Sequence, residues 1–261
     1  MLKSALPLAA CLLAAGTVSG QTLEAPKTFL SDYSISMMGL PLGQSSFRTV
    51  IDGDSYRVDG HLRSAGIARI FDKTVAQSRV EGTFTDHGAQ SKTYSLSYVS
   101  GEKRSKALLV FANGNVVTAN VTPKPKMRKS YVPVEAAHMR AVADPLTAAI
   151  VKAGSIGKVC DRTLHVFDGK MRLDLHLSNP RVASAAVPGF KGEAVTCSAR
   201  FVPIAGYRKG QKSIEFLKAN SGISITFAEN GSTGVYGPLK ASIPTYIGQL
   251  DITATKFSLA K

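Results

Sequence analysis

Short segments of alternating apolar and polar residues, separated by turn dipeptides, place the strongest limit on how this chain can fold. Asp52-Gly53, Asn113-Gly114 and Asp168-Gly169 each lie between runs of period two, which is the strongest short-range sequence signal for a β-hairpin. A strand with this alternation buries one face, and a tight turn makes neighbouring strands antiparallel. The sequence therefore predicts an all-β, mainly antiparallel fold, as a curved sheet or a partly open barrel.

One segment, DPLTAAIVKAG, carries helix signals instead. Asp144 can cap the free N–H groups of a first turn, Pro145 suits the first helical position, and Gly154 can end the helix. A helix of about ten residues is only marginally stable alone. We therefore predict one short helix at 145–153 that packs against the sheet.

The first twenty residues, MLKSALPLAACLLAAGTVSG, have the composition of a secretory signal peptide. Lys3 precedes an apolar run over 5–16, which is shorter than the roughly 20 residues of a membrane-spanning helix. Small residues precede Gln21, where we predict cleavage. The mature chain, 21–261, is then a single mostly antiparallel β domain without a transmembrane segment, in the bacterial periplasm.

The alternative is a lipid anchor, because LAAC at 8–11 matches a lipoprotein acylation box. An acylated cysteine normally closes its hydrophobic region, whereas here the apolar run continues past Cys11. Cleavage before Gln21 is therefore the favoured interpretation, with a lipid on Cys11 as the alternative.

The charge balance points to anionic partners. The formal net charge is +14, and loss of residues 1–20 removes only one cation. In an exported protein this favours an anionic lipid or glycan of the envelope, while a periplasmic protein is a further candidate and nucleic acid is not expected. The alternative is that the charge only aids solubility. The densest basic run, in TPKPKMRKSYVP, is either solvated surface or a contact for anions; its cations are Lys124, Lys126, Arg128 and Lys129.

Loss of the signal peptide leaves two cysteines, Cys160 and Cys197, in an oxidising compartment. Strand alternation places Cys160 on the mainly apolar face of its hairpin and gives Cys197 the same parity as Val195 and Phe201. Two sulfurs that face apolar neighbours favour a structural disulfide over a metal site. We predict a Cys160–Cys197 disulfide.

The hairpin TLHVFDGKMRLDLHL contains two histidines on one face. A two-residue turn at Asp168-Gly169 would place His165 opposite Arg172 and Asp161 opposite His176. The histidines would then lie two residue pairs apart, and each pair adds about 6 to 7 Å. This register predicts that the two imidazoles do not share a metal ion.

Catalytic motifs are missing. The chain has no Gly-x-Ser-x-Gly elbow, no His-Glu-x-x-His and no phosphate-binding glycine loop. SGEK at Ser100–Lys103 matches a Ser-x-x-Lys pattern but lies where a hairpin turn is expected, and its Lys-Thr-Gly and Ser-Asp-Asn partners are absent. We predict no catalytic residues, no metal and no cofactor.

Several segments carry a family resemblance when they are taken in order: YSISMMGLPLGQSSFRTVIDGDSYRVDG, ADPLTAAIV, CDRTLHVFDGKMRLDL, CSARFVPIAGY and ASIPTYIGQLDITATKF. Together they resemble the exported bacterial family catalogued as domain of unknown function 3108, of the alphaproteobacterial type, over roughly Tyr33 to Phe257. The resemblance implies a mostly β protein of the Gram-negative envelope, without an assigned reaction and without catalytic residues to transfer.

Two classes of function stay open. The first is a non-catalytic periplasmic envelope protein, whose curved sheet shelters a hydrophobic or anionic envelope component or a partner protein. The second is a periplasmic hydrolase with an unrecognised site on His61, His87 or His138. A continuous apolar groove favours the first class, and a cleft that joins His to Asp or Ser favours the second.

The signal peptide generates the first prediction. Mass spectrometry and N-terminal sequencing of the protein purified from the envelope should give a first residue of Gln21 and no lipid. A chain that begins at a lipid-modified Cys11 would contradict this prediction and establish the anchored alternative.

Overall fold

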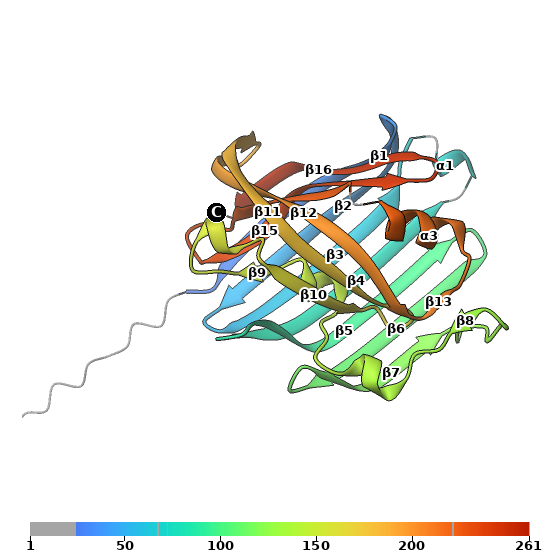
Figure 1. Cartoon of the computed structure of the whole chain (residues 1–261). Helices are drawn as coiled ribbons and strands as arrows, with labels where there is room; N and C mark the ends of the chain where they lie inside the picture. Colours follow the sequence, from blue (N-terminus) through green and yellow to red (C-terminus); the bar gives the residue numbers. More distant parts are fainter. Residues whose placement is uncertain (1–24, 67, 72, 221, 261) are drawn as a thin grey trace, which may run out of the picture.

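The structure, a computed structural model, describes residues 25–66, 68–71, 73–220 and 222–260. The predicted signal peptide and Cys11 lie outside these ranges. One antiparallel sheet coils into an open barrel (Figure 1). Its strands are β1 (Lys27–Met37), β2 (Leu40–Asp52), β3 (Ser55–Ser64), β4 (Thr74–Thr85), β5 (Gly88–Ser100), β6 (Lys103–Ala112), β7 (Asn115–Thr122), β9 (Val151–Lys152), β10 (Arg162–Phe167), β11 (Arg172–Val187), β12 (Phe190–Ala205), β14 (Ile223–Glu229), β15 (Val235–Thr245) and β16 (Gly248–Leu259).

The sheet follows the order β10-β11-β12-β14-β15-β16-β1-β2-β3-β4-β5-β6-β7, and β9 pairs with β15. A separate short pair joins β8 (Tyr131–Val132) to β13 (Tyr207–Arg208). The described residues also form α1 (Ala68–Phe71), α2 (Pro145–Ala148) and α3 (Lys212–Ala219), with 3-10 turns at Ala136–Met139 and Ile156–Lys158. The predicted fold class is confirmed, because the chain is mainly antiparallel sheet in a barrel-like curve.

Two of the predicted hairpins form, one at its expected dipeptide and one shifted by a single residue to Gly53-Asp54. Asp52 pairs with Ser55 across the turn between β2 and β3. Asn113 and Gly114 connect β6 to β7, with φ of 51° and 73° respectively. Positive φ at both central residues is the backbone conformation of a type I′ turn, which the Asn-Gly dipeptide favours. Local turn chemistry therefore sets the register of these strands.

The two edges of the sheet, β10 and β7, approach each other without pairing directly. The segment Val142–Asp144 lies between them: the Val142 N–H donates to the Gly114 carbonyl at 2.9 Å, and the Ala143 N–H donates to the His165 carbonyl at 2.8 Å. Beyond this segment, the backbone at Gly169 lies against the side chains of Val121 and Leu109. A connecting segment thus bridges the gap, and the barrel interior is enclosed on this side.

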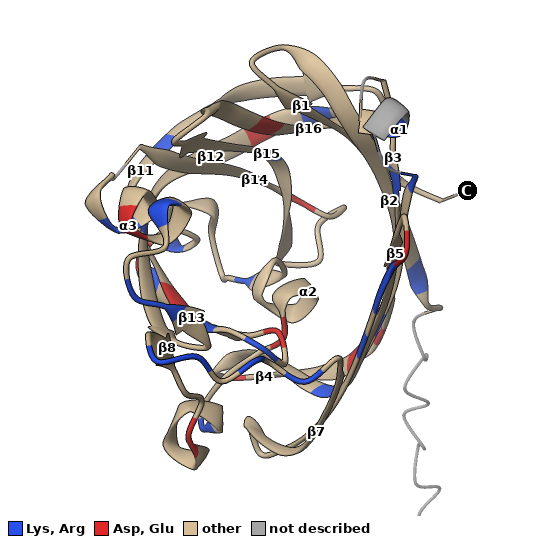
Figure 2. Ribbon diagram, turned by 90° about the vertical axis from the view of Figure 1, so that its right-hand side faces the viewer, with Lys and Arg blue, Asp and Glu red and all other residues tan. Residues whose placement is uncertain are grey.

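After this bridge the chain turns into the barrel, where α2 lies in the centre (Figure 2). The predicted cap is confirmed, because the Asp144 side chain accepts hydrogen bonds from Leu146 N and Thr147 N. The predicted helix at 145–153 is too long, since α2 ends at Ala148. Val151 and Lys152 pair with β15 instead, so strand pairing inside the barrel overrides the continuing helical pattern.

The structure contains a longer helix that our sequence analysis did not assign. α3 spans Lys212–Ala219, buries Ile214 against the cluster around the disulfide and begins after Gln211, which makes no side-chain capping bond. The helical spacing of Ile214 and Leu217 indicates this helix in the sequence. The residue before it, Gln211, is not a typical N-cap residue, so the start of the helix has no clear sequence signal. Among the described residues, no helix is both long and apolar enough to cross a bilayer.

The expected register of the β10–β11 hairpin is wrong by two residues. Phe167 pairs with Arg172, and His165 pairs with Asp174, so that four residues form the turn. The cause is Asp168, whose carboxylate accepts the backbone N–H groups of Lys170 and Met171 at 2.7 Å each. This Asx-type turn replaces the two-residue turn, and because the shift is an even number each side chain keeps its face.

The two cysteines lie together at the end of the segment that enters the barrel. The Sγ atoms of Cys160 and Cys197 are 2.04 Å apart and their Cα atoms are 5.3 Å apart. Both residues are fully buried, in one cluster with Val195 and Phe227. The pair joins the chain before β10 to β12, across 37 residues of sequence.

Removal of this link should destabilise the protein. Closing a loop of 37 residues corresponds to roughly 3 to 4 kcal/mol in the chain-entropy view. The Cys160→Ser, Cys197→Ser double variant should therefore melt well below wild type in a calorimetric scan. Peptide mapping without reductant should show the linked pair in the exported protein; free thiols there would contradict the prediction.

Candidate functional site

The barrel encloses an apolar cavity of about 330 Å³ beside α2. One wall comes from α2 and the two residues after it, and the others come from inward-facing positions of β1, β2, β3, β15 and β16. Strand alternation explains this lining, because every second residue of β1 from Phe29 to Ile35 points inward. The wall residues include Phe29, Ile35, Phe47, Val58, Leu62, Leu146, Ala149, Ile150, Ala241, Ile252 and Phe257.

The polar groups on the cavity wall are few. The Tyr33 hydroxyl donates to the Pro238 carbonyl at 2.7 Å, and burial raises the pKa of Tyr33 to about 12. Tyr33 is therefore neutral near pH 7. Among the residues that line the cavity, Lys240 is the one with an ionised side chain, and it is exposed. The wall offers an apolar surface with little hydrogen-bonding capacity.

A buried polar network holds α2 in place on the side away from this cavity. The Asp144 carboxylate lies 2.5 Å from Ser91 Oγ and 2.6 Å from Thr147 Oγ1, and Thr147 Oγ1 lies 2.7 Å from the Tyr56 hydroxyl. A side chain at Gly82 would overlap the Tyr56 hydroxyl, so this glycine gives Tyr56 its room. Residues from β3, β4 and β5 thus fix the start of α2.

Burial dominates the protonation of Asp144, which is fully inaccessible to solvent. Desolvation raises the pKa of the carboxyl, while hydrogen bonds from Ser91, Thr147 and Leu146 lower it, and the net shift is upward. The side-chain hydrogen-bond partners of this carboxyl among the described residues are the hydroxyl groups of Ser91 and Thr147. The site is a structural anchor rather than an acid–base pair that faces a substrate.

The histidines of the β10–β11 hairpin bind neighbouring side chains rather than each other. His165 Nδ1 lies 2.6 Å from Asp174 Oδ1, and His176 Nδ1 lies 2.8 Å from Thr163 Oγ1. Burial works to raise the pKa of Asp174, but hydrogen bonds from His165 and Arg172 outweigh it and hold that pKa below its usual value. In the described part of the chain, no group of three His, Cys, Asp or Glu side chains could hold a metal ion.

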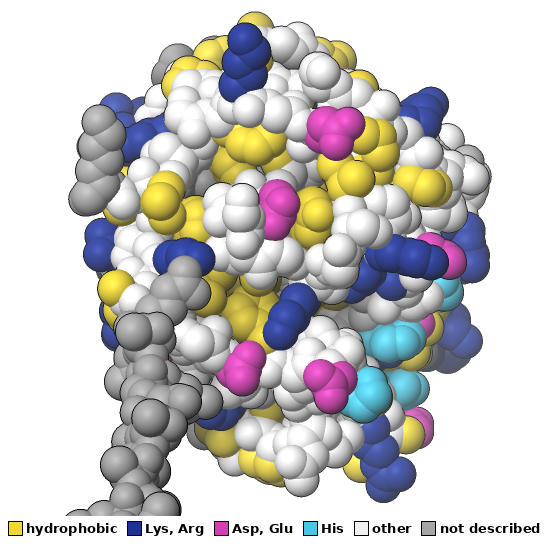
Figure 3. Space-filling model, turned by 90° about the vertical axis from the view of Figure 1, so that its left-hand side faces the viewer, with side chains coloured by type: hydrophobic (Ala, Val, Ile, Leu, Met, Phe, Trp, Pro, Cys, Tyr) yellow, Lys and Arg dark blue, Asp and Glu magenta, His cyan; other side chains and the backbone are white. Residues whose placement is uncertain are grey.

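His165 and His87 line one open hollow of about 460 Å³. Its described lining residues include Thr163 and Arg162 but neither serine nor cysteine. The His165–Asp174 pair has no serine or cysteine beside it among these residues, and the Thr163 hydroxyl contacts His176 rather than His165, so the three groups of a hydrolase triad are not aligned here. Figure 3 shows histidine side chains gathered on this end of the barrel, near acidic and basic groups.

The three histidines of the hydrolase hypothesis do not come together. His61 is exposed on β3, His87 lies in the turn between β4 and β5, and His138 lies in a 3-10 turn where its Nδ1 accepts the Glu135 N–H at 3.0 Å. The SGEK segment forms the expected turn between β5 and β6, with Ser100 paired to Lys103. The three histidines do not share a cleft. His61 alone lines a hollow of about 580 Å³ with Asp32 and Ser46, which lie in one cross-strand row with it.

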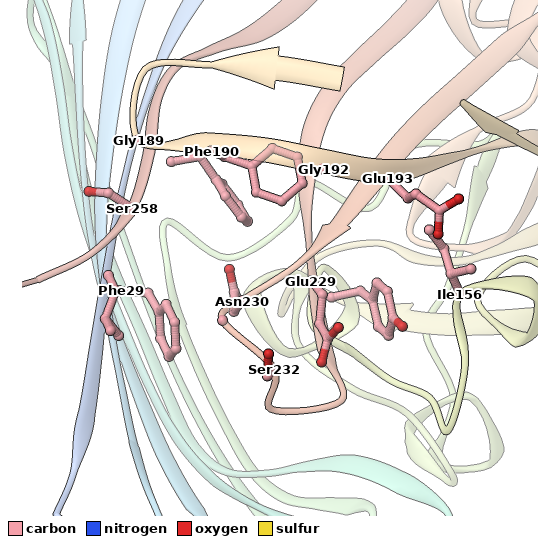
Figure 4. A pocket seen from close by; sticks show the side chains of 14 residues that line it. Phe29, Ile156, Gly189, Phe190, Gly192, Glu193, Glu229, Asn230, Ser232 and Ser258 are labelled. Atoms are coloured by element: carbon pink, nitrogen blue, oxygen red, sulfur yellow. The ribbon is translucent and has the colours of Figure 1, made fainter. Parts of the chain in front are cut away.

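A second hollow, of about 470 Å³, opens at the same end of the barrel as His87. Figure 4 shows Phe29 and Phe190 on one side of it and Glu193 and Glu229 on the other. Glu229 accepts the Gly234 N–H at 2.8 Å, so that one carboxylate already stabilises a turn. The hollow has both apolar and polar walls, and its lining residues include no converging set of reactive groups.

The predicted basic residues lie together on an exposed loop before β8. The pair β8–β13 brings this loop beside Arg208 and Lys209, and the Lys209 N–H donates to the Ser130 carbonyl at 2.9 Å. Lys126, Arg128 and Arg208 line one shallow hollow. Sequence analysis found the first half of this basic surface but not Arg208 and Lys209, because strand pairing between distant segments joins them. The predicted loop residues are Lys124, Lys126, Arg128 and Lys129.

The fold and the cavity define a class of protein: an open antiparallel β-barrel with an apolar interior. The chain belongs to the family described as protein of unknown function (DUF3108), whose model matches residues 32–255. It is also similar to the crystal structure of a β-barrel-like protein of domain of unknown function DUF1849 from Brucella abortus. That similarity has a TM-score of 0.46 and 10% identity, and it covers 90% of this chain and 98% of the other. No curated protein matches the sequence.

The buried carboxyl generates a prediction on pH dependence. Folding raises the pKa of Asp144, so the native state retains a proton that the unfolded chain releases. The free energy of unfolding therefore falls as the pH rises from the pKa of Asp144 in the unfolded chain to its pKa in the folded chain. Asp144→Asn keeps a neutral cap, so its free energy of unfolding should fall less steeply with pH than that of wild type above about pH 4.

Denaturant unfolding between pH 4 and pH 8 measures this difference. Asp144→Ala is the control, since it removes the cap and should cost roughly 1 to 2 kcal/mol or more at every pH. Parallel curves for wild type and Asp144→Asn would show that the carboxyl is ionised in the native state.

Proposed function

We propose that the protein is a non-catalytic binding protein of the bacterial periplasm, which holds an apolar chain, such as the acyl chain of a lipid, inside its barrel. The observation that carries this proposal is the cavity beside α2. Its volume of about 330 Å³ falls in the range of roughly 300 to 1,000 Å³ that ligand sites occupy. Its walls are built from aliphatic and aromatic side chains of five strands and one helix.

Energetics favour an apolar ligand over a polar one. Each methylene group buried from water contributes about 0.8 kcal/mol, so ten methylenes offer about 8 kcal/mol before the costs of ordering the ligand. A polar ligand would lose hydrogen bonds to water and find few replacements on this wall. Tyr33 already donates its proton to Pro238, and the wall has no acid–base pair.

Export to the periplasm is part of the proposal. The signal-peptide pattern of residues 1–20 supports it, as does a buried cysteine pair at disulfide distance. An extracytoplasmic compartment between two membranes would supply lipids, and a barrel that shields an acyl chain from water would suit it.

The absence of tryptophan from the chain makes a direct test possible. Ile150 lines the cavity, so an Ile150→Trp variant carries a single fluorescent reporter at the site. A brominated C16 to C18 fatty acid should quench this emission with saturation at one equivalent per protein. Val117→Trp is the matched control, because Val117 is 61% exposed on β7 and should not be quenched.

A second variant should block the site. Ala149→Phe places a ring in the cavity and should weaken fatty-acid binding at least tenfold, while Ala119→Phe on the exposed face of β7 should leave it unchanged. Thermal melts of both variants check that they fold. Unchanged affinity in a folded Ala149→Phe protein would place the ligand elsewhere and defeat the proposal.

A further inference from the structure

Strand direction sorts the connections of the barrel into two rims. In an antiparallel sheet, successive turns alternate between the two ends. One end, which we call the basic rim, carries the connections β1–β2, β3–β4, β5–β6, β7–β8, β10–β11, β12–β14 and β15–β16. The opposite rim carries β2–β3, β4–β5, β6–β7, β9–β10, β11–β12 and β14–β15. The basic rim faces the viewer in Figure 2.

Positive charge is concentrated on the basic rim. On the opposite rim, the turns 53–54, 86–87, 113–114, 188–189 and 230–234 contain neither lysine nor arginine, and the longer connection 153–161 contains one cation, Lys158. Acidic residues also occur on the connections of the basic rim. Two of them already have partners, because Glu215 pairs with Lys218 and Asp168 accepts backbone N–H groups. Figure 2 shows cations around this opening. The described ones are Arg69, Lys73, Lys124, Lys126, Arg128, Lys129, Lys170, Arg208, Lys209, Lys212 and Lys218.

Large apolar side chains also project from the basic rim. Their exposed fractions are 63% for Met38, 56% for Tyr246 and 55% for Ile247. Leu40 is exposed beside them at 49%, and Met127 is 70% exposed on the separate β7–β8 connection. Scattered exposed apolar residues are normal in soluble proteins, whereas a group on adjacent turns indicates an interaction surface. Met127 lies within the basic loop, so apolar and cationic groups occur on the same connection.

Two hairpin tips form the apolar part of the rim. The Met38 N–H donates to the Gln249 carbonyl at 2.9 Å, which holds the β1–β2 tip against the β15–β16 tip. Met38 has a φ of 49°, a conformation that favours Gly, Asn or Asp over residues with a longer side chain. The sequence therefore places an exposed methionine where the turn itself would favour another residue, which points to a role for the side chain.

We propose that the basic rim docks on an anionic phospholipid bilayer, with the two hairpin tips in the membrane interface and the surrounding cations over the headgroups. Cations near an anionic bilayer are attracted to its surface potential, and Tyr, Leu, Ile and Met gain from leaving water at the interface. An acidic glycan matches the cations but provides no apolar phase for Met38 and Ile247. A bilayer matches both features.

This inference rests on the proposed function and deepens it by naming the source of the ligand. Ile35 and Ile252 line the cavity and pair with each other across β1 and β16. Ile35 precedes the tip residue Met38 by three positions, or about 10 Å of strand. The cavity extends from Asn230, in the β14–β15 turn of the opposite rim, to Ile35 near the tips of the basic rim. An acyl chain leaving a bilayer at the basic rim would have a short path to its near end.

Single-tryptophan reporters test the docking geometry in the otherwise tryptophan-free chain. Vesicles of phosphatidylcholine with about 30% phosphatidylglycerol, some carrying brominated acyl chains, should shift the emission of Ile247→Trp to shorter wavelength and quench it. Val117→Trp on β7, which is equally exposed, should keep the emission of a water-facing indole. Equal quenching at both positions would overturn the proposed orientation.

Vesicle flotation of the full chain measures the contributions of the two features. A Met38→Ser, Ile247→Ser double variant should partition at least tenfold more weakly, and the Val117→Ser, Val182→Ser control should partition like wild type. Replacement of Lys124, Lys126, Arg128 and Lys129 by Glu should weaken binding further, as should high salt or vesicles of phosphatidylcholine alone. The sites are exposed, so each variant should melt like wild type. Binding that is unaffected by both sets of changes would overturn the inference.

The two proposals fail in different ways. If the Ile150→Trp variant binds soluble brominated fatty acid but wild type does not float with anionic vesicles, the docking inference is wrong and the proposed function stands. If wild type floats with vesicles, the Met38→Ser, Ile247→Ser variant does not, and brominated fatty acid fails to quench Ile150→Trp, then the docking inference stands and the proposed ligand is wrong.

Discussion

The buried cap at Asp144 is the interaction on which the centre of this molecule depends. A helix of four residues has no stability of its own, yet α2 forms one wall of the inner cavity. Two backbone N–H groups and two hydroxyl groups converge on the carboxyl, and the hydroxyls come from Ser91 of β5 and from Thr147, which contacts Tyr56 of β3. Leaving any of these buried groups without a partner would cost free energy. The network therefore couples the position of α2 to β3 and β5.

The sheet and the cap could be predicted from sequence because both depend on local rules. Asn113-Gly114 adopts the turn that its residue types favour, and Asp144 caps the helix that follows it. The length of α2 could not be predicted in the same way, since Val151 and Lys152 continue a helical pattern but pair with β15. The turn at Asp168-Gly169 shows a further limit: a side-chain hydrogen bond to Lys170 and Met171 widened it.

The candidate site itself combines residues that no local pattern connects. The cavity wall joins Phe29 of β1 to Leu146 of α2 and to Ala241 of β15, and only the curvature of the sheet brings them together. The basic surface likewise joins Lys126 to Arg208 through the β8–β13 pair. Sequence analysis could give the parity of each strand and the charge of each loop. It could not tell which rim a loop occupies without the strand order.

The segment that enters the barrel is fixed along its whole length, and this bears on how a ligand reaches the cavity. Asp144 holds its start, pairing of Val151 and Lys152 with β15 holds its middle, and the link between Cys160 and Cys197 holds its end. A wall tied at three points keeps its shape whether or not a ligand is bound, so little conformational entropy is lost on binding. Opening the cavity by withdrawing α2 would break a buried hydrogen-bond network. Access at a rim would leave this network intact, because the residues nearest the rims that line the cavity, Ile35 beside the hairpin tips and Asn230 at the opposite end, take no part in it.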